Sequence, residues 1–206
     1  MGTLNHILSG CKIALAQGRY KWRHDKVLHE LALSVEKQVV VNSSVMATGR
    51  KVIHFVKEGQ KKEQEGQKHN ESYLSSAKDW KVSVDLDKKL KIPAEITLTN
   101  LRPDMILVSK SSRQLGVVEL TVPNEDRIEV SGELKRAKYE KIACEGRQKG
   151  WKVRIWAVEV GSRGFPAASM VSFLKEIGMN GSQRRKSLEK IGHTIWKASN
   201  YREWGK

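Results

Sequence analysis

Two carboxylates stand where a β-sheet would normally carry apolar side chains. Asp104 follows an Arg-Pro pair at the start of the run MILVS, and Glu119 interrupts the apolar run LGVVELTV. The polar residues KSSRQ separate these runs, so residues 104–109 and 115–122 are predicted to pair as an antiparallel hairpin. Facing residues of such a pair lie within about 5 Å of each other, and diagonal ones within about 7–8 Å. Two carboxylates that close repel each other unless a cation lies between them.

Oxygen ligands of this kind indicate Mg²⁺ (or Mn²⁺). Mg²⁺ keeps several of its waters and binds proteins through one or two carboxylates together with a substrate phosphate. Hydrolysis at such a site also needs a positive group to hold the attacking water and the charge that develops on the phosphate. The pattern therefore predicts a phosphodiester-hydrolysing centre with a lysine or arginine close to the carboxylates.

That positive group must come from outside the second strand, because the residue two beyond Glu119 is Thr121. From Glu119 to the strand end at Pro123 the chain advances about 13 Å, at 3.3 Å per residue. A helix that starts near residue 126 and runs back recovers this distance in about nine residues, at 1.5 Å each, and so reaches Lys135.

Lys138 is the second candidate for this role. It lies one helical turn beyond Lys135, and its column of the helix also holds Leu134 and Ile142, which would point toward the sheet. Either Lys135 or Lys138 is therefore predicted to face Glu119.

The remaining patterns supply the elements that position these residues. Apolar residues recur with a helical period over 21–41, and the polar segment 57–78 lacks any period, which predicts an exposed loop outside the core. The fold class expected is α/β, with a mixed sheet that contains the antiparallel hairpin and is flanked by helices. The predicted order is helix 21–41, strands 51–56 and 80–86, the hairpin, helix 125–148, strand 151–160, and helices 165–178 and 181–204.

The charge of the chain favours a polyanionic partner. Its 206 residues contain 38 Lys plus Arg against 23 Asp plus Glu, a formal net charge of +15. Such an excess attracts nucleic acid, the commonest intracellular polyanion. Solubility alone is the alternative explanation, and an acidic membrane surface is a weaker one, since no basic amphipathic stretch carries a bulky aromatic face.

Several protein classes are disfavoured. No window approaches eighteen consecutive apolar residues, and the N-terminal residues lack the pattern of a secretion signal, so we expect no membrane partner. Cys11 and Cys144 are far apart and predict no disulfide framework. A reducing, intracellular compartment is expected, and a DNA partner would make it the nucleus.

The motifs together resemble a known family. RPD, then VELT with Glu119, then KRAKY in a helix, all preceded by a helix with WRHD, resemble the PD-(D/E)xK restriction-like endonuclease domain. TLNHILSGC followed by RYKWRHDKVL is similar to the join between the zinc knuckle and this endonuclease at the C-terminal end of site-specific non-LTR retrotransposon polyproteins. The similarity covers residues 3–160.

The resemblance implies a restriction-endonuclease-like core in which Asp104 and Glu119 bind a divalent metal. A lysine moved from the strand to the helix, Lys135 or Lys138, would complete the site. It also implies a division of the chain into a zinc-knuckle remnant at 1–18, the endonuclease core at 19–165 and basic C-terminal helices at 166–206.

The chain departs from the family at the knuckle. Of a Cys-Cys-His-Cys set only His6 and Cys11 are present, and two ligands do not close a tetrahedral zinc site. We therefore expect these two residues not to hold zinc in this chain alone. The chain looks like a separated part of such a polyprotein.

Two groups of residues are candidates for DNA contact. Arg23 and His24 belong to the WRHD motif, and Arg184, Arg185 and Lys186 are consecutive in the last predicted helix. Consecutive basic residues spread around a helix suit phosphates better than a single base edge. The alternative is that both groups lie on solvated helix faces.

Three functions remain open from the sequence. The first is an Mg²⁺-dependent endonuclease that nicks a DNA strand by water attack on a phosphodiester. The second is an inactive DNA-binding remnant that kept the fold and the charge. The third is a junction- or repair-type nuclease with the same core. Cleavage of both DNA strands would usually need a homodimer, and the sequence does not decide the oligomeric state.

Overall fold

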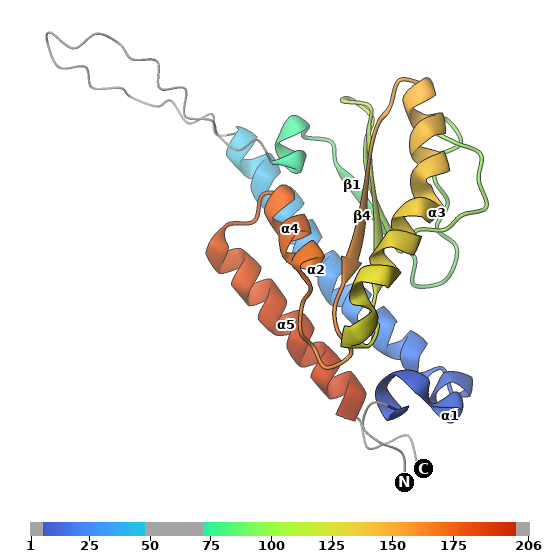
Figure 1. Ribbon diagram of the computed structural model, residues 1–206. Coiled ribbons are helices and arrows are strands. Elements are labelled where there is room, and N and C mark those ends of the chain that lie inside the picture. Colours follow the sequence, from blue (N-terminus) through green and yellow to red (C-terminus); the bar gives the residue numbers. More distant parts are fainter. Residues whose placement is uncertain (1–5, 48–71, 201–206) are drawn as a thin grey trace, which may run out of the picture.

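The computed structural model describes residues 6–47 and 72–200, which form a mixed α/β fold (Figure 1). Its sheet has four strands in the order β1-β2-β3-β4. The first three strands are antiparallel, and β4 runs parallel to β3. The strands are β1 (Lys81–Val84), β2 (Met105–Ser109), β3 (Gln114–Thr121) and β4 (Lys152–Glu159). The predicted hairpin is therefore confirmed, whereas the predicted strand 51–56 lies outside the described residues.

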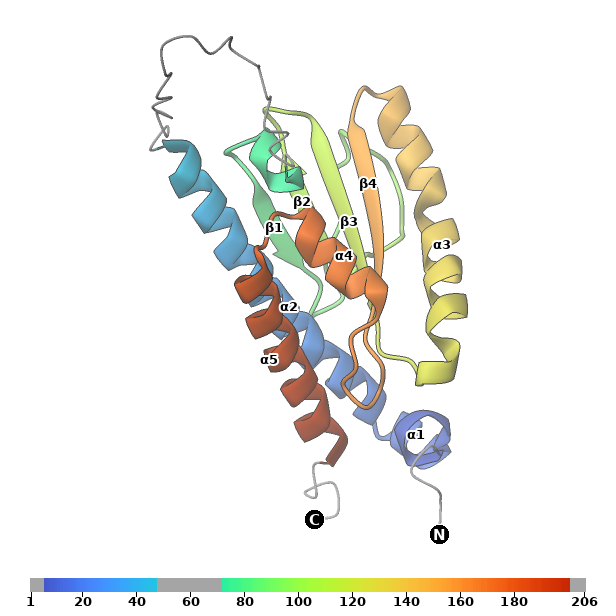
Figure 2. The ribbon, with the colours of Figure 1, turned by 60° about the vertical axis from the view of Figure 1, so that its left-hand side comes forward.

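Helices cover both faces of this sheet (Figure 2). One face packs against α3 and the segment 90–101, and the other packs against α2, α4 and α5. The long helices are α2 (Arg19–Ala47), α3 (Ile128–Gln148), α4 (Ala168–Glu176) and α5 (Gly181–Asn200). The short helical elements are η1 (His6–Gly10), α1 (Lys12–Ala16), η2 (Tyr73–Ser76) and η3 (Glu125–Arg127).

The alternation of side chains in β2 explains how two cores form on one hairpin. Met105 and Leu107 lie in the cluster with α2, α4 and α5, whereas Ile106 and Val108 lie in the cluster with α3. All of β2 is buried, because both of its faces are covered by helices. Gly116 of β3 leaves room for the side chain of Trp156 on β4. A Cβ at position 116 would lie only 2.7 Å from Cζ3 of Trp156.

The C-terminal helices belong to the same core as the sheet. Phe173 of α4 is fully buried, and its ring centroid lies 5.2 Å from that of Trp156 on β4. Ile191 and Ile195 of α5 are also fully buried in this cluster. Residues 166–200 are therefore packed into the domain through apolar side chains, in addition to being basic.

Part of the predicted exposed loop is in fact core. Leu74 of η2 is fully buried. The ring centroid of Tyr73 lies 4.8 Å from that of Trp156 and 4.9 Å from that of Trp80. The Trp80 indole N–H also donates to the Leu74 carbonyl oxygen, at 3.0 Å. The prediction of an exposed segment was wrong for residues 72–75 and for Ala77, because a single turn with one Leu and one Tyr carries no detectable period.

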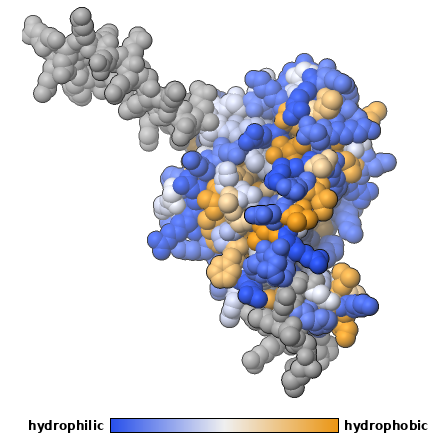
Figure 3. Space-filling model, viewed as in Figure 1, coloured by the Kyte–Doolittle hydropathy of each residue, from blue (hydrophilic) through white to orange (hydrophobic). Residues whose placement is uncertain are grey.

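The surface mixes charged and apolar regions. In the view of Figure 3, an apolar band crosses the face of the molecule between α4 and α3, where β4 forms the edge of the sheet. Within residues 6–47 and 72–200, no helix combines the length and the apolarity that crossing a membrane requires.

Candidate active site

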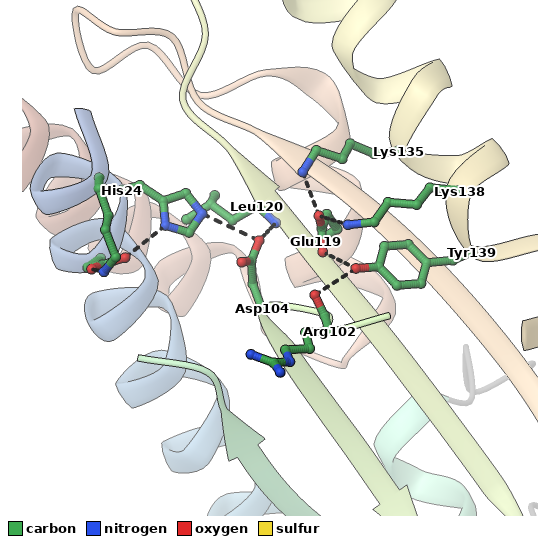
Figure 4. Close-up of polar contacts among 10 residues, drawn as sticks. His24, Arg102, Asp104, Glu119, Leu120, Lys135, Lys138 and Tyr139 are labelled. Carbon is green, nitrogen blue, oxygen red and sulfur yellow. Dashed lines mark hydrogen bonds and ion pairs between the residues drawn. The ribbon is translucent and has the colours of Figure 1, made fainter. Parts of the chain in front are cut away.

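Glu119 is the centre of the candidate site. It lies on the α3 side of β3 and is 3% exposed. Its Oε1 accepts hydrogen bonds from Nζ of Lys135, at 2.5 Å, and from Nζ of Lys138, at 3.2 Å. Its Oε2 lies 2.7 Å from the hydroxyl oxygen of Tyr139. Figure 4 shows these three side chains of α3 converging on one carboxylate.

The structure thus brings both predicted lysines to Glu119, but the face of α3 differs from the predicted one. Tyr139 and Ile142 are buried against the sheet, whereas Leu134 is 68% exposed. Leu134 was wrongly expected to face the core in the same column as Lys138. Lys138 instead lies at the flank of the buried face and extends sideways to the carboxylate, with its Nζ 4.7 Å from the centre of the Tyr139 ring.

Tyr139 is a site residue to which the sequence assigned no role. Its hydroxyl oxygen also lies 2.9 Å from the carbonyl oxygen of Arg102. Burial raises the pKa of Tyr139 well above its ordinary value, and the charge of Glu119, its hydrogen bond and the charge of Asp104 raise it further. The hydroxyl therefore remains protonated and serves as a donor to Glu119.

Asp104 lies directly before β2, opposite Glu119 if the β2–β3 register is continued by one pair. Its Oδ2 accepts a 2.7 Å hydrogen bond from the backbone N–H of Leu120. The same oxygen lies 3.4 Å from Nε2 of His24 on α2. Asp104 and Glu119 thus occupy one end of the hairpin, between α2 on one side and α3 on the other (Figure 4).

His24 contacts this site rather than lying on an open surface. Its Nδ1 is 3.2 Å from Oδ1 of Asp25, so the ring lies between two carboxylates. Burial alone would lower the pKa of His24, but the hydrogen bonds and charges of Asp104 and Asp25 outweigh burial and raise the pKa above its ordinary value. The two carboxylates therefore favour the charged form of the imidazole next to Asp104.

Arg23 was predicted to contact DNA, but its side chain is inside the protein. It is 5% exposed, and its Nη2 donates a 2.9 Å hydrogen bond to the carbonyl oxygen of Leu8. Its Nη1 lies 3.5 Å from Oγ of Ser199 on α5. Arg23 therefore joins the N-terminal residues, α2 and α5, and its guanidinium is directed at the protein's own atoms.

The three α5 residues predicted to contact DNA, Arg184, Arg185 and Lys186, differ in what they contact. Arg184 is half-buried, and its Nη1 donates to the carbonyl oxygen of Met179 at 2.7 Å, which stabilises the link between α4 and α5. Arg185 is 82% exposed and pairs with Glu189 one turn on, at 2.8 Å. Lys186 is exposed and lines a groove between α2 and α5. Only Arg185 and Lys186 are thus presented at the surface.

Two buried oxygen atoms lie on the strands just beyond Glu119 in the register of the sheet. Thr121 on β3 and Glu159 on β4 are paired across the two strands, just beyond Glu119. Oγ1 of Thr121 and Oε1 of Glu159 are both buried and have no hydrogen-bond partner in the part of the chain that the structure describes. Unpaired buried oxygens are costly, and Mg²⁺ takes oxygen ligands.

A closed cage of protein ligands is absent from the described parts of the chain. No group of three or more His, Cys, Asp or Glu side chains is arranged there to hold a metal ion. His6, Cys11 and Cys144 accordingly form no such group with their neighbours. Asp104 and Glu119, the predicted metal ligands, belong to no such group within the described ranges.

Comparison with known proteins gives no functional assignment for this site. No protein-family model matches the chain, and no curated protein matches its sequence. Function is therefore inferred from the residues of the site and their geometry.

Proposed function

We propose that this chain is a divalent-metal-dependent endonuclease that hydrolyses a phosphodiester bond in DNA. The observation that carries the proposal is the convergence of Lys135, Lys138 and Tyr139 on the buried carboxylate of Glu119, opposite Asp104. This set resembles the carboxylates and lysine of the PD-(D/E)xK domain, with the lysine supplied by a helix.

Each residue has a role in the proposed reaction. Asp104 and Glu119 would hold Mg²⁺ or Mn²⁺, which when bound polarises the phosphate and favours deprotonation of water. Lys135 or Lys138 would hold the attacking water and offset the negative charge that develops on the phosphate. Tyr139 orients Glu119, since its hydroxyl keeps a proton to donate.

The reaction is a simple substitution at phosphorus. The water oxygen forms a bond to phosphorus, one phosphorus–oxygen ester bond breaks, and the leaving oxygen takes up a proton. A dimer of the chain would bring two such sites to the two DNA strands. A monomer would nick one strand.

An inactive DNA-binding protein is the second candidate, and one observation favours it. Both oxygens of Glu119 already have partners from α3. A buried carboxylate satisfied in this way also stabilises a core without any chemistry. An inactive protein of this kind would still bind DNA through the net charge of +15 but would require no metal.

A plasmid assay separates the two candidates. Supercoiled plasmid is incubated with the protein and Mg²⁺, Mn²⁺ or EDTA, and DNA binding is measured in parallel in EDTA. The endonuclease proposal expects nicked circles with either metal and none in EDTA. DNA binding without cleavage at any metal concentration would favour the inactive binding protein.

A further inference from the structure

Residues 160–167 form a turn that is tied to the ends of β3 and β4. It begins where the two strands end, and the backbone N–H of Gly161 donates to the carbonyl oxygen of Phe165 at 2.8 Å, which closes the turn. Three further backbone hydrogen bonds anchor it: Val160 to Thr121 at 3.0 Å, Ser162 to Pro123 at 2.8 Å, and Ala167 to Glu159 at 3.1 Å.

Contacts with η3 and α5 fix the same turn from other sides. Oε1 of Glu125 accepts a 2.9 Å hydrogen bond from the backbone N–H of Arg163. On α5, Oγ of Ser199 donates to the carbonyl oxygen of Ser162 at 3.1 Å. Gly164 has φ +98°, and a Cβ there would lie 2.9 Å from the carbonyl oxygen of Gly192, so the turn packs directly on the helix backbone.

This fixed turn presents an aromatic ring and a guanidinium to solvent. Phe165 is 67% exposed, and the Arg163 side chain is 51% exposed, with its Nε 3.9 Å from Oε2 of Glu125. Trp196, one helical turn beyond Gly192 on α5, is 58% exposed. A rigid support for an exposed ring indicates a surface that binds a flat apolar group.

The position of the turn relates it to the candidate active site. Val160 bonds to Thr121, which is two residues beyond Glu119. From Glu119 to Pro123, where Ser162 is held, a strand spans about 13 Å. At about 3.4 Å per nucleotide along one strand, that distance corresponds to only a few nucleotides.

We propose that the turn binds DNA with unpaired nucleotides, through stacking of an exposed base on Phe165 and contact of Arg163 with a neighbouring phosphate. Every base has a flat face that stacks on an aromatic ring, and a guanidinium pairs well with phosphate. The chain's charge of +15 suits this partner. The inference rests on the proposed DNA function and narrows its substrate to DNA that is unpaired a few nucleotides from the cut.

Binding in EDTA tests this proposal separately from cleavage. The full chain is titrated against a labelled blunt duplex and against the same duplex with a three-nucleotide bulge. Phe165→Ala and Phe165→Trp are compared with Leu98→Ala, a control that removes another exposed apolar side chain, 81% exposed. Thermal unfolding of each variant verifies that it is folded. A 5-iodouracil in the bulge is photo-crosslinked, and the attached peptide is identified by mass spectrometry.

The expected result is specific to the unpaired substrate. Phe165→Ala should weaken binding of the bulged duplex about tenfold, in the range found for one stacked base. It should change binding of the blunt duplex less than twofold, Phe165→Trp should retain affinity, and the crosslink should lie on Phe165. Equal losses on both duplexes, or no loss on either, would overturn the proposal. Because no metal is present, this result is independent of whether the chain cleaves DNA.

Discussion

The hydroxyl of Tyr139 on α3 lies 2.7 Å from Oε2 of Glu119 on β3, in the buried part of the candidate site. Tyr139→Phe removes this donor from a carboxylate that is 3% exposed. We expect the free energy of unfolding to fall by about 1–3 kcal/mol, the usual cost of leaving a buried polar group without its partner. Urea denaturation followed by circular dichroism measures it.

Tyr73→Phe is the matched control for this substitution. The Tyr73 hydroxyl is buried too, but it has no hydrogen-bond partner among the described residues. Its removal should leave stability unchanged or slightly higher, because an unsatisfied polar group is lost. Equal destabilisation by both substitutions would mean that the Tyr139–Glu119 hydrogen bond contributes nothing specific.

The two lysines should differ in their effect on cleavage. Lys135 has the shorter contact with Glu119, whereas Lys138 bonds to the same oxygen at 3.2 Å and is 38% exposed, with hydrogens left for water. We expect Lys138→Met to slow nicking about 100-fold or more, a typical loss for a group that assists proton transfer. Lys141→Met, which removes an 83% exposed lysine from the same helix, should have no effect. Nicking rates are measured with enzyme in excess over plasmid. Full activity of Lys138→Met would mean that Lys135, or neither lysine, holds the attacking water.

His24 should titrate above its ordinary range. The pKa of His24 is raised in the folded protein by the hydrogen bonds and charges of Asp104 and Asp25. The contacts of the charged ring therefore stabilise the fold fully below the unfolded pKa of about 6.5. This stabilisation is lost as the pH rises through the folded pKa. The NMR titration midpoint of the His24 ring should exceed 6.5, and Asp104→Asn should lower it. An unchanged midpoint in Asp104→Asn would show that the His24–Asp104 contact does not determine the charge of the ring.

Of the three α5 residues predicted to contact phosphates, Arg185 and Lys186 are exposed and remain candidates. Their double substitution by alanine should weaken binding of all duplex sequences alike. Each lost phosphate contact should flatten the slope of log affinity against log salt by about 0.9. An unchanged slope would assign both residues to solubility. Arg184→Ala should instead lower thermal stability, since its guanidinium holds the Met179 carbonyl.

The sequence predicted the Glu119–Lys135 contact because the rise per residue of strands and helices is nearly constant. The number of residues along β3 and back along α3 was enough to place these two side chains together. The same number did not predict which face of α3 packs against the sheet. Leu134 is exposed, since the helix orientation follows from the tight packing of Gly132, Tyr139 and Gly146 against the sheet.

Contacts between distant segments were not predictable in this way. His24 and Asp104 are 80 residues apart, and only the packing of α2 beside the hairpin brings them together. Arg23 was predicted to contact DNA because it belongs to the WRHD motif, yet its guanidinium bonds to the Leu8 carbonyl inside the protein. The charge and motif patterns carry no information on which basic residues the fold buries.

The most direct test of the account is single-turnover nicking of supercoiled plasmid by Asp104→Asn. Asp87→Asn, which changes an exposed aspartate outside the site, is the matched control. Thermal unfolding and DNA binding in EDTA are measured for both variants. The account predicts Mg²⁺-dependent nicking by the wild type and by Asp87→Asn, and a rate at least about 100-fold lower for a folded, DNA-binding Asp104→Asn. Nicking by Asp104→Asn at the wild-type rate would contradict it.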